Sequence, residues 1–355
     1  MNPRASNHFD LFRFVAASLV LFSHAFTLTQ GNSANEPLML ASHGKDTLGE
    51  CAVAAFFIMS GYLISASWQA KRKLKPFFAA RAARIFPGLI LMLAALYLAG
   101  ACLSDKPIAD YLFATPVDFF AKLLLHGRFE LTAQAFANNP YPLALNGALW
   151  TLRYEVLCYL VLGALGFLAL LRRVAVWFLW LLLMALCFRA GGLGHVIGDH
   201  PLYSLGAWFV AGMLVQLHDV PIASKTGFGF GLVLIAVALA AGAYPLLMSP
   251  FIAKGLIDLA KQDGPLSGFG KFGDFSYGIY IYAFPIEQLS VTILNKLAVP
   301  CPWWMCCLVS FPFTLLCAML SWHLVEKRAL DYVRKRGAKP TEAVLQPGSL
   351  KELVK

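Results

Sequence analysis

Long apolar runs separated by short polar segments make up most of this chain. The runs are about 20 residues long, the length an α-helix needs to cross the hydrocarbon core of a bilayer. We predict about ten such helices, over residues 10–28, 51–68, 85–103, 148–171, 173–190, 202–218, 227–243, 244–260, 273–295 and 303–325. The pattern therefore predicts an all-α, polytopic integral membrane protein.

The distribution of positive charge predicts the orientation. Lys and Arg concentrate after the second run and after the last one: Lys71, Arg72, Lys73, Lys75, Arg81 and Arg84, then Lys327, Arg328, Arg334, Lys335 and Arg336. Because such residues favour cytoplasmic segments, we expect both termini in the cytoplasm. This requires an even number of spans, so the weak run 244–260 is counted. We expect 1–326 to form one membrane domain and 327–355 a basic, mobile cytoplasmic tail.

The composition agrees with a membrane protein, and it argues against nucleic-acid binding and against a metal site. Hydrophobic residues make up 59% of the 355 residues and charged residues 14%, against roughly 25% charged residues in a soluble domain. The net charge of +10 lies mostly in short loops and the tail, so we attribute it to membrane topology and expect no nucleic-acid binding. The eight cysteines include no CxxC pair and no His/Cys cluster, so we expect no metal site.

Three ionisable residues inside predicted spans are candidates for function, because charge within a membrane is costly. Arg13 and His24 are eleven positions apart, which puts them on one helix face about 16 Å apart. We expect both to face one polar cavity, with His24 near the outer side. Glu155 is expected at the depth of His24, where its carboxylate would orient an imidazole base. The structural alternatives are a snorkelling or ion-paired Arg13, an interfacial His24, and a Glu155 that only pairs with Arg153 or another helix.

The arginine pair Arg81 and Arg84 opens the third predicted span at its cytoplasmic end. Residues three apart share a helix face, and guanidinium groups bind phosphate well. The alternative is that these arginines only hold lipid headgroups. Taken together, the charges predict a phosphate-binding inner mouth, a polar path marked by Arg13, and a His/Glu pair near the outer side.

With these residues, six motifs in order resemble the acyltransferase 3 family of bacterial membrane O-acyltransferases, from about Phe9 to Glu326. The motifs are the Arg/His pair of the first helix, FFIMSGYLI from Phe56, RAARIFP, LWTLRYE, SYGIY from Ser276 and a closing glutamate at Glu326. The chain departs from the pattern where Ala283 replaces a histidine of many members and Arg328 a proline. Those two positions therefore have no catalytic role here.

The resemblance implies transfer of an acyl group, most commonly acetyl, from cytoplasmic acyl-CoA to a hydroxyl of an extracytoplasmic or exported glycan or glycolipid. It also implies a bacterial inner membrane location and acyl-CoA as co-substrate. Arg81, Arg84 and Arg13 would bind the donor. His24 would act as general base or acyl carrier, oriented by Glu155.

Four further residues of the matched motifs are candidates for substrate contact or for helix packing: Ser60, Tyr277, Tyr280 and Glu326. Ser60 is followed by Gly61, and a small pair of this kind permits close helix packing in membranes. The tyrosines are also explained as packing or interfacial aromatics. The role of Glu326 is open between substrate contact and pairing with basic neighbours.

Two other classes of function fit the pattern. A transporter or flippase of an amphipathic glycolipid accounts for the spans, the basic loops and the intramembrane charges, but it would not consume a CoA thioester. A membrane scaffold or sensor could use the long outer segment 104–147, which is otherwise a lid or a spacer. The scaffold gives no reason for Arg13, His24 and Glu155 to share a cavity. The sequence leaves the oligomeric state open.

Overall fold

The computed structural model describes residues 7–103, 136, 138–142, 144–191, 194–198, 200–218, 245–262 and 264–337. All regular elements within these ranges are helical, as predicted, and no strand occurs among them. The helices are α1 (Phe9–Gln30), α2 (Pro37–Ala41), α3 (Leu48–Lys71), α4 (Leu74–Leu103), α7 (Leu152–Phe167), α8 (Arg173–Arg189), α9 (Pro201–His218), α11 (Ser249–Lys261), α12 (Ser276–Lys296), α13 (Trp303–Ser321) and α14 (Lys327–Gly337).

Five described segments are long and apolar enough to cross a membrane. They are Phe9–Gln30, Leu48–Lys71, Leu74–Ala99, Leu149–Phe167 and the continuous Trp303–Arg336. Four more predicted spans coincide with α8, α9, α11 and α12, although α11 has 13 residues and so covers only about 20 Å. The predicted span 227–243 lies outside the described residues. The chain is therefore a membrane protein with several apolar helices, while the number ten and the orientation stay predictions.

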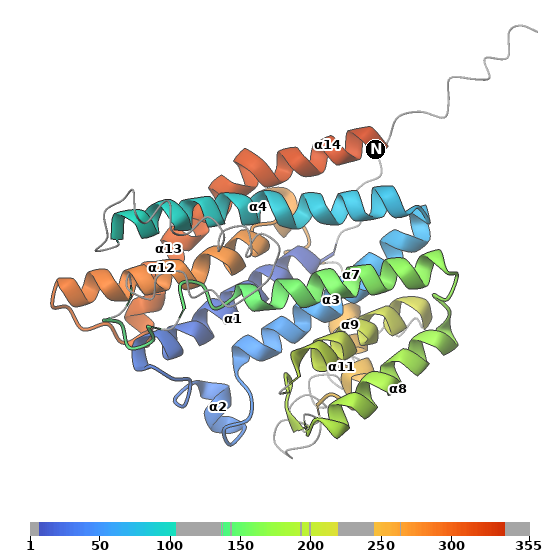
Figure 1. Ribbon diagram of the computed structural model, residues 1–355, viewed down its shortest axis with the longest axis horizontal. Coiled ribbons are helices and arrows are strands. Elements are labelled where there is room, and N and C mark those ends of the chain that lie inside the picture. The colour runs from blue at the N-terminus through green and yellow to red at the C-terminus, as the bar shows by residue number, and fades with distance from the viewer. Residues whose placement is uncertain are drawn as a thin grey trace, which may run out of the picture.

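Helix α1 lies in the middle of the bundle and packs against α3, α12 and α13 (Figure 1). Its side chains at Ala17 and Ala25 are fully buried, and their small size allows the neighbouring helices to approach closely. Helix α3 packs in turn against α9, and α4 lies beside α14. A residue on α1 can therefore contact several other helices at once.

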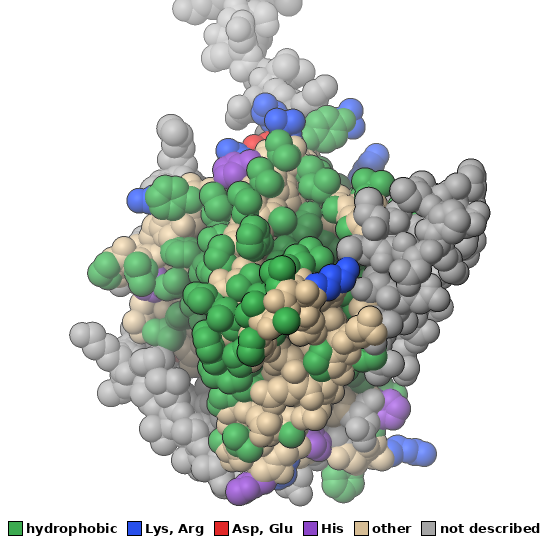
Figure 2. All heavy atoms as spheres, turned by 90° about the vertical axis from the view of Figure 1, so that its left-hand side faces the viewer, with side chains coloured by type: hydrophobic (Ala, Val, Ile, Leu, Met, Phe, Trp, Pro, Cys, Tyr) green, Lys and Arg blue, Asp and Glu red, His purple; other side chains and the backbone are tan. Residues whose placement is uncertain are grey.

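The outer surface of the bundle is largely apolar. Figure 2 shows a broad continuous area of hydrophobic side chains on one face, with few Lys or Arg side chains among them. Large side chains such as Phe178 on α8 and Leu308 and Phe313 on α13 are exposed. Exposed apolar surface on this scale is costly in water and favourable against lipid tails.

Helices α3 and α9 touch through their backbones at two glycines. A Cβ atom on Gly61 would lie 1.9 Å from the carbonyl oxygen of Phe209, and one on Gly212 would lie 2.1 Å from the carbonyl oxygen of Ile58. Real Cβ atoms do not approach backbone this closely, so only glycine fits at either position. The predicted packing role of the Ser60-Gly61 pair is confirmed for Gly61.

The chain before α7 runs down into the bundle along α12 in a non-helical conformation. Asn139 donates to the side-chain oxygen of Gln288 at 2.8 Å, and Asn146 donates to the backbone carbonyl of Ile281 at 2.8 Å. Between these two partners α12 advances about 10 Å. Irregular backbone at membrane depth is tolerated when protein buries it and satisfies its polar groups. We call residues 138–142 and 144–148 the re-entrant segment.

Basic side chains, among them Arg13, Lys71 and Arg334, lie together at one end of the bundle. At this end α1 and α12 begin, α3 ends and α14 packs alongside. We call this the basic end of the bundle. Helix α14 continues from α13 through a π-helical turn at Trp322–Glu326 and reaches Gly337. We expected a mobile tail from residue 327, but residues 327–337 form a helix that packs against α4. The remaining tail lies outside the described residues.

The contact between α3 and α9 can be tested with two glycines of the same helix. We expect Gly212→Ala to destabilise the protein by about 1–3 kcal/mol, because the added methyl group overpacks a backbone contact. The measurement is the thermal unfolding midpoint in detergent. Gly206→Ala is the matched control, since its Cβ would meet only the Leu183 side chain at 3.5 Å. Equal midpoints for the two variants would contradict the packing described.

Candidate active site

A cavity of about 730 Å³ lies at the basic end, between α1, α3, α4, α7, α12 and α14. Seven basic side chains line it: Arg13, Lys71, Arg81, Arg84, Lys271, Lys327 and Arg334. Three acidic side chains line it as well: Asp10, Glu155 and Asp274. The excess of basic side chains gives the cavity a positive potential that suits an anion, and its volume lies within the usual range of ligand pockets.

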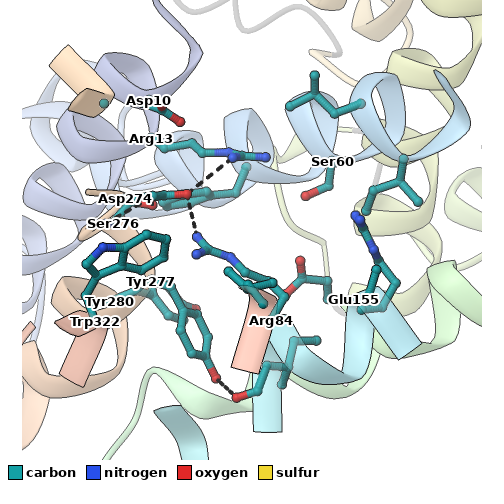
Figure 3. Close-up of a pocket in the computed structure, with 18 of the residues that line it drawn as sticks. Asp10, Arg13, Ser60, Arg84, Glu155, Asp274, Ser276, Tyr277, Tyr280 and Trp322 are labelled. Carbon is teal, nitrogen blue, oxygen red and sulfur yellow. Dashed lines mark hydrogen bonds and ion pairs between the residues drawn. The ribbon is translucent and has the colours of Figure 1, made fainter. Parts of the chain in front are cut away.

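Asp274 holds two of the cavity arginines. Its Oδ2 atom lies 2.7 Å from Nη2 of Arg84 and 3.5 Å from Nη1 of Arg13, and Figure 3 shows both guanidinium groups pointing at it from two sides. Its other oxygen accepts from the hydroxyl of Ser276. One carboxylate thereby joins the first turns of α1, the third turn of α4 and the turn before α12.

Sequence reasoning missed Asp274. It also accepts a hydrogen bond from the backbone N–H of Ser276, at 3.3 Å, so its position resembles that of an ordinary capping aspartate before a helix. The SYGIY motif begins two residues later, and that proximity is the signal that would have drawn attention to it.

Arg84 is enclosed by more than its ion pair. Its guanidinium carbon lies 5.6 Å from the ring centre of Tyr277 and 5.8 Å from that of Trp322. A carboxylate oxygen of the buried Glu326 lies 3.9 Å from its Nη1. Trp322 and Glu326 both belong to the π-helical turn, and such turns are frequent at functional sites because they redirect side chains.

Arg81 differs from its partner in the predicted pair. Its Nε atom is buried and has no hydrogen-bond partner among the described residues, which also give it no ion pair. A buried donor without a partner is costly, and a bound anion would satisfy it. The structure thus commits Arg84 to Asp274 and leaves Arg81 available to a ligand.

Glu155 lies in this same cavity rather than beside His24. Its carboxylate accepts a hydrogen bond from the hydroxyl of Tyr159, one helical turn along α7. The described residues show no hydrogen bond between Glu155 and His24, so the predicted pair is not formed. The reason is the re-entrant segment, which carries the chain well into the bundle before α7 begins. Glu155 therefore lies deeper in the bundle than one predicts by counting residues from the outer end of the span.

His24 does not line the cavity, and the single cavity predicted for Arg13 and His24 is not present in the described structure. Three aromatic side chains, Phe56, Tyr280 and Phe284, lie along the way from the cavity to His24, and we call them the aromatic wall. Tyr280 on the cavity wall packs edge-on against Phe56 at 5.9 Å, and one turn along α12 the ring of Phe284 packs edge-on against His24 at 5.2 Å. His24 is only partly exposed, and its Nδ1 atom is buried without a hydrogen-bond partner among the described residues.

The remaining predicted residues also line the cavity, except Glu326, which contacts it through Arg84. Ser60 faces it from α3, and Figure 3 shows its hydroxyl directed inward. Tyr277 donates to the backbone carbonyl of Ile85 at 2.8 Å. Tyr280 lies 2.8 Å from the carbonyl oxygen of Ala148 and 2.6 Å from the Thr151 hydroxyl. The tyrosine hydroxyls therefore bind protein groups and fix α12 in place.

Metal ligands were not expected from the sequence. Within the part of the chain that the structure describes, no group of three or more His, Cys, Asp and Glu side chains lies close enough together to hold a metal ion.

Apolar helices around a cavity rich in basic side chains define the class, an integral membrane protein with a charged cavity inside its helical bundle. Comparison with known proteins gives the family. The family model described as an acyltransferase domain matches residues 7–323, most of the chain and all the helices named above except α14. The chain belongs to this acyltransferase 3 family, as the motifs predicted, and it is a membrane acyltransferase.

Two curated relatives agree with this assignment along almost their whole length. The "O-acetyl transferase" of Shigella phage Sf6 is 29% identical, with 92% of this chain and 96% of the relative covered. "Nodulation protein 10" of Rhizobium leguminosarum bv. viciae is also 29% identical, with 91% of this chain and 93% of the relative covered. No solved structure matches the chain significantly.

The shared role of Asp274 can be tested by removing its charge. We expect Asp274→Asn to destabilise the protein by about 1–3 kcal/mol, because the Arg84 guanidinium then lacks its partner in a largely buried site. The thermal unfolding midpoint measures this. Asp258→Asn is the control, since Asp258 is about as buried as Asp274 but pairs with a single lysine, Lys254, one turn away in the same helix. A larger effect at Asp258 than at Asp274 would contradict the assignment.

Proposed function

We propose that this protein transfers an acyl group, most simply acetyl, from acyl-CoA to a hydroxyl group of a glycan or glycolipid. The family supports acyl transfer, and the name of the Shigella phage Sf6 relative supports acetyl and an oxygen acceptor. The observation that carries the donor assignment is the cavity at the basic end, where the buried Nε of Arg81 has no hydrogen-bond partner among the described residues. This end would face the cytoplasm of a bacterial inner membrane, where acyl-CoA is made.

Arg81 would bind a phosphate of CoA. The donor's phosphates need several cations, and Lys71, Lys271 and Arg334 line the same cavity. Guanidinium groups bind phosphate oxygens through paired, charge-assisted hydrogen bonds, so a buried Arg81 would contribute most. Arg84 and Arg13, predicted as further phosphate ligands, would shape the cavity wall, where Asp274 holds both of them.

His24 would act on the acceptor hydroxyl beyond the aromatic wall. The pantetheine arm would run from the cavity along α12, past Tyr280, and the ring of Phe284 would move aside to admit the thioester. As the hydroxyl oxygen attacks the thioester carbon, His24 takes the hydroxyl proton. The carbon–sulfur bond breaks, and the proton passes to the sulfur of CoA. A general base of this kind contributes roughly 10²–10⁴-fold. Alternatively, His24 carries the acyl group covalently and gives ping-pong kinetics.

The acceptor would reach His24 from the end opposite the basic end. The re-entrant segment approaches there: the Tyr141 ring lies 6.4 Å from that of Phe284, and a Cβ on Gly147 would overlap the Phe284 ring. This segment therefore lies next to the proposed catalytic base, and its Asn138 side chain is exposed, while the amides of Asn139 and Asn146 bind α12. Amide and hydroxyl side chains suit the hydroxyl groups of a sugar.

The function is tested by CoA release from acetyl-CoA by the purified protein in nanodiscs, supplemented with a cell-envelope extract as acceptor source. We expect His24→Ala to abolish release while the variant elutes and unfolds like the wild type. His218→Ala is the matched control, because His218 lies at the end of α9, where its ring binds Trp177. Equal release by wild type and His24→Ala would remove His24 from the mechanism and favour a glycolipid transporter.

Donor binding is tested separately from chemistry at Arg81. We expect Arg81→Ala to raise KM for acetyl-CoA about 10- to 100-fold, because a charge-assisted contact worth about 1.5–3 kcal/mol is lost. The matched control is Arg172→Ala, a change at an arginine outside the cavity. If both variants keep the wild-type KM, the donor does not bind through Arg81.

A further inference from the structure

One buried carboxyl group, that of Glu287, lies on α12 in the half of the bundle that contains His24. Glu287 on α12 is fully buried, and neither of its carboxyl oxygens has a hydrogen-bond partner among the described residues. An ionisable group held inside a membrane bundle without a partner is expensive and needs an explanation. The mechanism above does not use it, and none of the six motifs contains it.

Contacts on both sides fix the direction in which Glu287 faces. On α12, Phe284 touches the His24 ring, and Val291 forms a buried cluster with Ala25 of α1. Glu287 lies between these two positions, within about 60° of both around the helix. It therefore faces α1 at the level of His24 and Ala25.

Helix α13 closes the third side of this layer. Cys306 belongs to the same cluster as Ala25 and Val291, and α13 packs along α12. One turn along α13 lies Ser310, fully buried and with its hydroxyl also unpartnered among the described residues. Glu287 thus lies in a layer between α1, α12 and α13.

His24 offers the complementary group. Its Nδ1 atom is buried and unpartnered among the described residues, while the side chain as a whole is partly exposed. An imidazole works as a base at one nitrogen when the other nitrogen holds a proton and donates it in a hydrogen bond. The carboxylate predicted for that task, Glu155, lines the cavity at the basic end, away from His24.

We propose that Glu287 is the positioning residue of His24, accepting a hydrogen bond from its Nδ1–H; this inference rests on the proposed function for the reaction it serves. The pairing requires a change of side-chain torsion that brings the Glu287 carboxylate to Nδ1 of His24. With Nδ1–H held, Nε2 keeps its lone pair and takes the proton of the acceptor hydroxyl. Glu287 stabilises the imidazolium until the proton passes to the sulfur of CoA, and both groups then return to their starting state.

The first test separates binding from chemistry in Glu287→Gln, which keeps the shape of the side chain. We expect kcat for CoA release to fall about 100-fold, and KM for acetyl-CoA to stay within about twofold. Thr314→Val is the matched control, because Thr314 is another buried, unpartnered polar group of α13 among the described residues. An unchanged kcat in Glu287→Gln overturns the proposal.

The second test reads His24 directly by ¹⁵N NMR of protein labelled at histidine, with the His24 signal identified by its loss in His24→Ala. We expect the wild type to carry the proton at Nδ1, and Glu287→Gln to shift the signal toward a mixture of tautomers. An unchanged signal overturns the pairing even if the protein releases CoA. A shifted signal in a protein that releases no CoA keeps the pairing and removes the proposed function. If Glu287→Gln does not fold, Glu287→Met, which places an apolar chain of similar length there, undergoes both tests.

Discussion

The carboxylate of Asp274 is the constraint on which the rest of this structure depends. Two arginines, Arg13 and Arg84, enter a bundle of apolar helices, and a buried guanidinium without a partner would be strongly destabilising. Asp274 lies within 3.5 Å of Arg13 and 2.7 Å of Arg84, and so links α1, α4 and the turn before α12. A polar cavity at membrane depth persists because its charges are arranged around this one group.

This arrangement divides the work between two arginines that look alike in the sequence. Arg84 is held by Asp274, by Glu326 and by the rings of Tyr277 and Trp322. Arg81 has none of these contacts and keeps an Nε without a partner among the described residues. A structural cation beside a free one forms a preorganised site, because the ligand need not displace an existing ion pair before it binds. Donor affinity would then depend on Arg81, and the shape of the donor site on Arg84.

Periodicity and charge were enough to predict most helices and the arginine pair. The spans predicted from hydropathy are helical wherever the structure describes them. The spacing of Arg81 and Arg84 also predicted correctly that both lie on one helix face at one end of the bundle, because residues three apart share a face. The depth of Glu155 was not predictable, since it depends on a non-helical segment that enters the bundle, and hydropathy contains no signal for such a segment. Asp274 and Glu287 were missed for different reasons. Asp274 stands at the start of the predicted span 273–295, where an acid is typical of a helix cap. Glu287 lies well inside that span, where the cost of a charge in the membrane applies as it does to Glu155, so the sequence does contain a signal for it.

The aromatic wall between the cavity and His24 is the most demanding part of the proposed mechanism. Donor phosphates at Arg81 and a base at His24 require the thioester to cross the layer of Tyr280 and Phe284. The decisive measurement is the structure of the protein in nanodiscs with a non-hydrolysable acetyl-CoA analogue. We predict phosphates against Arg81, a pantetheine arm along α12, and a displaced Phe284 ring with the acyl carbon beside His24. An analogue bound away from Arg81, or one that ends in the cavity with Phe284 still packed on His24, would contradict this mechanism.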